Sequence, residues 1–233
     1  MRTPEVDAIL VRAEALASGW NHAGPAVEHV LIATLEEPQA RKILRDAGGD
    51  VDALQRDLVP LVRYLVVNVR PNLAPWIETI EAKTNRGGSA TTPGMLLAEI
   101  LAATHSAAVM VVLQRVRRVD VLNVVAHGIV KAETSPLPRA WLVRGGSEKP
   151  GGRYRVVMHD DMYTTYGVVT EIVVARFDKS KAEAAELAAR AHADGRVVVG
   201  TYPLKVASKK VAQATAFARA LGYPLRLSVE PDD

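Results

Sequence analysis

The sequence predicts two domains, an all-α domain followed by an α+β domain, and three observations lead to this fold class. Apolar residues recur at spacings of three and four from Glu5 to about Gly128, as on the buried faces of helices. A stretch rich in Gly, Pro and Ser follows, and beyond it apolar and polar residues alternate as in a strand. A chain of 233 residues is also long enough for two separate hydrophobic cores.

The changes in composition set the expected domain boundaries. The helical domain, the linker and the α+β domain are expected at residues 1–130, 131–152 and 153–233. A linker is expected because Thr134–Pro138 and Gly145–Gly152 contain too few apolar residues to fold by burying surface. Trp141 and Leu142 are exceptions within it, and we expect them to dock on a neighbouring domain.

The helical domain contains an internal repeat. The segments Val30–Ala33 and Val51–Leu54 return in the same order as Met95–Ala98 and Val119–Leu122. The offset between the copies is 65 residues for the first segment and 68 for the second, which indicates about three added residues in the loop between them. We therefore expect two pseudo-repeated helical units that pack together and contain five or more short helices in all.

The most apolar window of the sequence, Leu96–Val112, lies in the second of these units. Glu99 and His105 interrupt it, so we interpret it as a buried pair of helices rather than a membrane span. His105 is accordingly expected to be a core histidine with satisfied hydrogen bonds. Near the start of the chain, Glu5 precedes any apolar run, unlike in a secretion signal, and a cytoplasmic protein without membrane contact is expected.

The α+β domain is expected to contain three strands and three helices in the order β-α-α-β-α-β. Ser180 or Asp178 is suited to cap the second helix, while Gly195 and Gly222 are suited to end the second and third helices. The expected elements are residues 154–159, 168–177, 180–193, 196–202, 204–221 and 225–229. This order is typical of helices that cover one face of a sheet.

The composition argues against several functional classes. The formal net charge is only +3, with 29 cationic and 26 anionic residues interspersed, so nucleic acid is not an expected partner. The absence of cysteine excludes thiol nucleophiles, thiolate metal sites and disulfide bonds. A metal site is an alternative, but its candidate ligands lack a recognisable nucleophile or water-activating partner; they are His159, Asp160, Asp161 and His192. We expect no metal, no cofactor and no enzymatic activity.

Residues 1–130 resemble the N-terminal domain of Clp unfoldases. The resemblance is carried by Val27–Leu35, Ala40–Leu44 and Asp52–Leu54 in the first repeat and by Leu96–Ala98, Ala107–Ala108, Val119–Leu122 and Ala126–Gly128 in the second. In some members of the family, the positions that match Glu28 and His29 bind a peptide or a phospho-group, which makes Glu28 a possible ligand site. The favoured alternative is that both residues cap and brace a helix. In the second repeat, Pro93–Gly94 occupies their places.

The C-terminal part, residues 153–230, resembles ClpS, the family of adaptors that deliver proteins with destabilising N-terminal residues to the Clp protease. The resemblance is carried by Tyr154–Asp161, Ala191–His192, Asp194–Gly200, Val206–Ala207, Lys210–Ala212 and Tyr223–Leu225. It implies a three-stranded antiparallel sheet with three helices. It also implies two kinds of partner, a Clp AAA+ unfoldase and proteins that begin with a large hydrophobic residue.

The same resemblance implies a site for such N-termini, which are called N-degrons. Asp160, Asp161 and His192 match the positions that hold the α-amino group, although the family usually has Asn at the first and an acid in place of Met162. The matching pocket for the first side chain consists of Thr164, Tyr166, Val169, Ala188, Ala191 and Leu225. Since Tyr166 and Ala188 replace the usual Met, the preferred first residue can differ from the usual Leu, Phe, Tyr and Trp set. The alternative for the two aspartates is a turn and a helix cap.

Docking on the unfoldase is implied for Lys205, Ser208 and Lys210, the first two of which replace the usual acids. Reversed charge at the rim of an interface changes association rate and partner choice more than it changes the fold. Because a domain that resembles the partner precedes this one in the same chain, contact between the two domains, in cis or in trans, is also expected.

The sequence has no G-x-x-x-x-G-K-[ST] motif, so ATP-driven unfolding is not expected of these residues. Two functions remain open. The first is an adaptor that recognises N-degrons and delivers them to a Clp unfoldase. The alternative is a regulator or decoy whose unfoldase-like domain sequesters adaptors or substrates and inhibits degradation.

Overall fold

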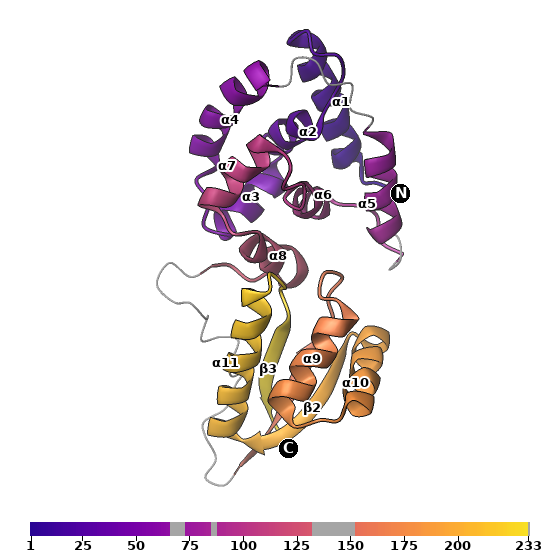
Figure 1. The fold of residues 1–233 in the computed structure, drawn as a ribbon, viewed down its shortest axis with the longest axis vertical. Helices are drawn as coiled ribbons and strands as arrows, with labels where there is room; N and C mark the ends of the chain where they lie inside the picture. Colours follow the sequence, from indigo (N-terminus) through magenta and orange to yellow (C-terminus); the bar gives the residue numbers. More distant parts are fainter. Residues whose placement is uncertain (66–72, 85–87, 132–151, 233) are drawn as a thin grey trace. The chain divides into compact units, whose positions relative to one another are not determined.

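The computed structural model describes residues 1–65, 73–84, 88–131 and 152–232 (Figure 1). The chain divides into two compact units, Met1–Val130 and Lys131–Asp233. Most of the expected linker, including Trp141 and Leu142, lies outside the described residues, so the linker and the docking of these two side chains stay predictions. Within the described ranges, no helix combines the length and the apolar character needed to cross a lipid bilayer.

The first unit consists of helices. In chain order they are α1 (Pro4–Gly19), α2 (Val27–Thr34), α3 (Pro38–Asp46), α4 (Val51–Leu65), α5 (Ala74–Thr84), α6 (Pro93–Ile100), α7 (Ala107–Arg115) and α8 (Arg118–His127). Proline begins α1, α3 and α6, where its missing N–H would have no helical partner in any case. Side chains also cap helices by accepting from backbone N–H groups that lack a helical partner. Glu37 accepts from the N–H of Ala40 at the start of α3, and Ser106 accepts from that of Val109 at the start of α7.

The internal repeat is confirmed. Helices α2, α3 and α4 of the first repeat correspond in order and spacing to α6, α7 and α8 of the second. Residues 35–37 join α2 to α3, whereas residues 101–106 join α6 to α7, so the second connection is longer by the three residues that the changing offset predicted. The insertion lies in a connection between helices, where added length costs little chain entropy.

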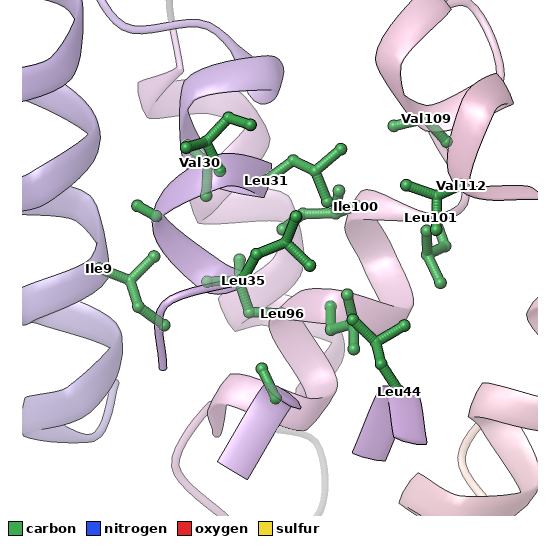
Figure 2. Close-up of a cluster of buried hydrophobic side chains, with 14 of the residues drawn as sticks. Ile9, Val30, Leu31, Leu35, Leu44, Leu96, Ile100, Leu101, Val109 and Val112 are labelled. Atoms are coloured by element: carbon green, nitrogen blue, oxygen red, sulfur yellow. The ribbon is translucent and has the colours of Figure 1, made fainter. Parts of the chain in front are cut away.

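The core of the first unit lies where the two repeats meet. Figure 2 shows Leu31 and Leu35 from the α2 segment beside Ile100 and Leu96 of α6, with Val30 on the same segment. All of these side chains are fully buried, and α2 packs against α6. Burial of each Leu or Ile contributes about 1.5–3 kcal/mol. Each repeat therefore supplies one apolar face to a core that neither could form alone.

The prediction for His105 is wrong. The Leu96–Val112 window does form a pair of helices, α6 and α7, whose inner faces are buried. His105, however, is exposed and lies in the turn that joins them. The run looked continuously apolar because two buried helices flank a short connection, and hydrophobicity alone does not mark where the first helix ends.

The second unit contains the predicted three strands and three helices. They are β1 (Arg153–His159), α9 (Tyr166–Phe177), α10 (Lys181–Asp194), β2 (Arg196–Pro203), α11 (Leu204–Ala220) and β3 (Arg226–Pro231). The strand order is β2-β1-β3, and both pairings are antiparallel. The fold class expected from the sequence, an all-α domain followed by this α+β domain, is confirmed.

One face of the sheet packs on the helices. Tyr154, Val156 and Met158 of β1 are buried in the same cluster as Val197 and Val199 of β2. The alternate residues of these strands, among them the exposed Val198, lie on the other face. The helices therefore cover a single face of the sheet, and α9 and α10 lie side by side over it (Figure 1).

Helix α10 has clear local signals at both ends. The hydroxyl of Ser180 accepts from the N–H of Glu183 at 3.2 Å, and the Glu183 carboxylate accepts from the Ser180 N–H at 2.8 Å. The Ser180 hydroxyl also donates to the Glu183 carboxylate at 2.8 Å, and the bonds to this carboxylate from the Ser180 backbone first and its hydroxyl second lower the pKa of Glu183. Gly195 then ends the helix with a φ of +76°, a conformation that residues with a Cβ rarely adopt. The end of α10 is thereby fixed next to the end of β1.

Candidate functional site

The candidate site lies where β1 and α10 both end. The backbone N–H of Asp160, the residue after β1, donates to the carbonyl of Gly195 at 2.9 Å. Its Oδ2 lies 3.3 Å from Nδ1 of His192. The side chain of Asp160 is 33% exposed and that of His192 is 83% exposed. Two of the three residues expected to hold an α-amino group are thus in contact and reachable from solvent.

Asp161 has a different environment from its neighbour. Its Oδ1 accepts from the backbone N–H groups of Tyr163 at 2.8 Å and Thr164 at 2.6 Å. Its Oδ2 accepts from the hydroxyl of Thr164 at 2.8 Å. These bonds fix the turn that leads into α9, as the turn interpretation of the sequence requires.

Four of the six residues expected to form the pocket lie on α9 and α10, which pack against each other, while Leu225 lies just before β3. Val169, Ala188, Ala191 and Leu225 are each at most 9% exposed and belong to one apolar cluster. Thr164, by contrast, is half-buried in the turn that Asp161 fixes. These residues come from three separate parts of the sequence, and a pocket formed by them stays a prediction.

Two exposed apolar side chains lie between the end of β1 and the first turn of α9. Met162 is 47% exposed and Tyr166 is 51% exposed, in a unit whose other large apolar residues are mostly buried. The hydroxyl of Tyr166 donates to the backbone carbonyl of Ala185 in α10. Ala185 was not expected in the site. Because it takes part through its carbonyl, no side-chain pattern could have indicated it.

The residues expected to dock on an unfoldase do not share one environment. Lys205 is exposed and Ser208 is half-buried near the start of α11. The Lys210 ammonium group donates to the Arg176 carbonyl at 2.8 Å and to Asp178 Oδ2 at 2.7 Å. It also lies 5.3 Å from the centre of the Tyr202 ring, and its side chain is only 19% exposed. Lys210 thus joins α11 to the end of α9, where a cation is favoured by the helix dipole.

In the helical unit, His29 braces the start of α2. Its Nδ1 accepts from the Ala26 backbone N–H at 2.9 Å, and its Nε2 lies 2.8 Å from Nδ1 of His22. His29 is fully buried. The pKa of His29 is lowered to about 4, mainly by burial and also by the charge of His22, while Glu28 opposes the shift. The geometry of His29 agrees with the bracing interpretation, while a ligand at Glu28 stays a prediction.

The second repeat has a pocket beside Gly94, one of the two residues that match Glu28 and His29. About 290 Å³ lies between α3, α6 and α8, lined by Ile43, Thr92, Gly94 and Val125 among others. A Cβ at Gly94 would lie 2.8 Å from Cδ1 of Ile43. Glycine here thus allows α6 to approach α3 closely.

The alternative metal site is not assembled. His159 is directed to β3, where its Nε2 lies 2.9 Å from the hydroxyl of Ser228. Among the residues that the structure describes, no cluster of three or more His, Asp or Glu side chains could hold a metal ion.

Comparison with known proteins identifies both parts of the chain. Residues 149–228 match the family model of the ATP-dependent Clp protease adaptor protein ClpS. Residues 1–111 match the model of the Clp repeat N-terminal domain.

Individual relatives match the C-terminal third. The Clp protease adapter protein ClpS of Syntrophus aciditrophicus is 40% identical over 77 residues, which is 33% of this chain and 72% of the relative. The protein of the same name from Oleidesulfovibrio alaskensis is 41% identical over 78 residues, 34% of this chain and 75% of the relative. One solved structure is that of Agrobacterium tumefaciens ClpS2 bound to L-phenylalaninamide. Its sequence is 30% identical to this chain, the TM-score is 0.34, and the match covers 35% of this chain and 98% of the ClpS2 chain.

The ClpS match covers β1, the turn after it, α9, α10, β2, α11 and the start of β3, whereas the Clp repeat match covers α1 to α6 and the first part of α7. Through residues 149–228, the chain belongs to the family of ATP-dependent Clp protease adaptor proteins ClpS, and a Clp repeat N-terminal domain precedes that part.

Proposed function

We propose that this protein is an adaptor of the Clp protease that binds polypeptides with a large hydrophobic first residue and delivers them to a Clp AAA+ unfoldase. The observation that carries the proposal is the contact of Asp160 with His192 beside the exposed Met162 and Tyr166. The first residue of a polypeptide carries its α-ammonium cation and its side chain on the same Cα, so its binding site needs acceptors and an apolar surface close together. Asp160 and His192 can supply the acceptors, and Met162 and Tyr166, two and six residues after Asp160, are exposed apolar side chains.

The cation is bound by acceptors. With its Nδ1 proton directed to Asp160, a neutral His192 presents Nε2 as an acceptor to a second donor. The carboxylate of Asp160 carries a charge opposite to that of the α-ammonium group. Asp161, the next residue, is a second carboxylate close to it in the sequence. Charge-assisted hydrogen bonds of this kind contribute about 1.5–3 kcal/mol each. An acetylated N-terminus lacks the charge and two of the donors, so it should bind poorly.

The apolar side chain is bound along the contact of α9 and α10. Burial of a Leu or Phe side chain there contributes about 1.5–3 kcal/mol. Added to the polar contacts, this is sufficient for roughly micromolar affinity once the cost of association is subtracted. The pocket assignments for Thr164, Val169, Ala188, Ala191 and Leu225 are part of this proposal.

Delivery requires a surface for the unfoldase. We assign it to the start of α11, where Lys205 is exposed and Ser208 is half-buried. Lys210 is included for its position, although its ammonium group is bound within the unit. The Clp repeat domain in the same chain resembles a part of the partner, which supports contact between the two domains in cis or in trans.

A second function has its own support. Because residues 1–111 match the Clp repeat domain, this domain could occupy adaptors or substrates in place of the unfoldase. The protein would then act as a decoy that inhibits degradation. Binding of N-degrons by the C-terminal unit is common to both functions, whereas the effect on degradation separates them.

Binding is tested with fluorescent peptides that begin with Phe, in a free and an N-acetylated form, by fluorescence anisotropy. The free peptide is expected to bind at least tenfold more tightly. Asp160→Ala should weaken the free peptide by about tenfold or more, since it removes a charge-assisted contact. Equal affinity of the intact protein for the free and acetylated peptides would refute N-degron recognition.

Asp161→Ala serves as the structural comparison. It removes three bonds of the turn that precedes α9, so it should lower thermal stability as well as affinity. Asp160→Ala should leave the midpoint of thermal unfolding nearly unchanged, because within the described ranges its carboxylate pairs with His192, which is itself exposed.

A further inference from the structure

Tyr166 is fixed at both ends of its side chain. As the first residue of α9, its backbone is held by the helix, and its hydroxyl donates to the Ala185 carbonyl in α10. The ring therefore crosses from one helix to the other. Even so, Tyr166 is 51% exposed, so one side of the ring remains open to solvent.

The ring borders the proposed pocket. Tyr166 and Val169 are three residues apart and share one face of α9, while Ala185 and Ala188 are likewise three apart on α10. The two helices pack against each other, and Val169 and Ala188 are both buried between them. The bond of Tyr166 to Ala185 thus places the ring beside this pair.

Small side chains make this placement possible. Helix α10 has the sequence KAEAAELAARAHAD and carries only methyl groups at Ala185 and Ala188. A longer side chain at either position would compete for the space through which the ring reaches the helix backbone. The large side chain at 166 and the small one at 188 are therefore complementary in size, although both replace the usual Met.

We propose that Tyr166, tied to Ala185, is a specificity-determining residue that favours an aromatic first residue, Phe, Tyr or Trp, over the branched aliphatic residues Leu, Ile and Val. This inference rests on the proposed function. A ring held by both ends presents a fixed, flat wall, and aromatic rings gain from offset or edge-to-face contact with it beyond the area they bury. A flexible Met in its place could adapt to branched chains. The expected preference for Phe over Leu is about three- to tenfold.

The test uses the full chain and peptides that differ only in the first residue, Phe, Trp, Leu or Ile, each in free and N-acetylated form. Tyr166→Phe keeps the ring and removes the bond to Ala185, so the preference for Phe over Leu should fall by about half or more. Tyr166→Met should make the affinities for Phe and Leu nearly equal. Tyr64→Phe, which removes the hydroxyl of an exposed tyrosine in α4, should change neither affinity.

The outcomes separate the two proposals. Tight binding of free peptides with equal affinity for Phe and Leu would overturn the role of Tyr166 and leave N-degron recognition standing. An aromatic preference that Tyr166→Phe leaves intact would overturn the role of the bond. Failure to distinguish free from acetylated peptides would overturn both proposals. Circular dichroism of Tyr166→Phe and Tyr166→Met, expected to match the unaltered protein, confirms that the comparison is made between folded chains.

Discussion

Two neighbouring aspartates in this protein have different roles, although the sequence presents them as a pair. Asp160 makes its side-chain contact with His192, 32 residues away, whereas Asp161 bonds to residues two and three positions ahead. The turn role of Asp161 could be expected from the sequence, because short-range bonds from Asp to the following backbone are a local property. The contact of Asp160 could be anticipated only through the resemblance to ClpS, since it depends on where β1 and α10 end in space.

At the same scale, Lys210 shows how a matched position can acquire a structural role. Its ammonium group is held by a carbonyl, a carboxylate and two aromatic rings, those of Phe177 at 5.9 Å and Tyr202 at 5.3 Å. Lys205 on the same helix is exposed. The sequence shows three lysines on one helix and contains no information about which of them is bound.

Lys210→Met is expected to lower the free energy of unfolding by about 1–2 kcal/mol, because it removes these contacts and keeps only the apolar stem. Lys205→Met should change it by less than about 0.5 kcal/mol, as is usual for exposed positions. Urea unfolding of both variants measures the difference. Equal stability of the two variants would show that the contacts of Lys210 contribute nothing net. Weaker unfoldase binding by the Lys205 variant alone would support docking through the start of α11.

At the scale of elements, the N-terminus of α2 depends on a directed chain of hydrogen bonds. Because His29 Nδ1 accepts from Ala26, the proton of neutral His29 is on Nε2, which donates to His22. The proton of His22 is then on its Nε2, which lies 3.1 Å from the Arg63 carbonyl in α4. Three separate segments are joined in this way, with Trp20 against both rings. A proton added to His29 would place two N–H groups against each other.

This arrangement predicts that the helical unit loses stability in acid. The pKa of His29 is lowered to about 4 in the folded chain, whereas it is 6.5 for an unperturbed histidine. Below pH 6.5 the unfolded chain therefore binds a proton that the folded chain does not, and stability falls as the pH decreases from about 6.5 toward 4. A shift of this size corresponds to at most roughly 3 kcal/mol.

The measurement is urea unfolding of the intact chain between pH 7 and pH 4, with hydrogen–deuterium exchange used to follow peptides from α2. His29→Gln is the matched control, because Gln at this helical position can reach the same N–H and does not titrate. The variant should show a flatter pH profile. Identical profiles for His29→Gln and the unaltered chain would show that His29 does not cause the loss.

Several elements could be predicted from local signals. The helix with Ser180 and Gly195 at its ends was expected at residues 180–193 and lies at Lys181–Asp194. His105 was not predicted correctly, because the connection between α6 and α7 contains Leu101 and Ala103, which are buried in spite of being outside a helix. Burial in a connection removes the contrast between helix and loop on which hydrophobic periodicity depends.

At the scale of the whole molecule, a Clp repeat domain and a ClpS domain lie in one chain. A tether raises the effective concentration of each domain for any surface that it shares with the other. This favours delivery if the helical domain leaves the start of α11 accessible to the unfoldase. It favours inhibition if the helical domain occupies that surface.

A degradation assay decides between these roles. Purified Clp protease and a reporter that begins with Phe are incubated with and without this protein, and loss of the reporter is followed over time. Delivery predicts faster loss that Asp160→Ala abolishes. Slower loss in the presence of the intact protein would contradict the adaptor function and support the decoy.

The sequence by itself determined the two fold classes, the internal repeat with its three-residue insertion, and the resemblance of each part to a Clp family. These properties depend on hydrophobic spacing and on capping residues, which act over a few positions along the chain. The tertiary structure decided which aspartate faces His192, that Lys210 is bound within its own unit, and that Tyr166 reaches the carbonyl of Ala185. Such contacts join residues 19 to 34 positions apart, so they form only when packing has brought separate helices and strands together.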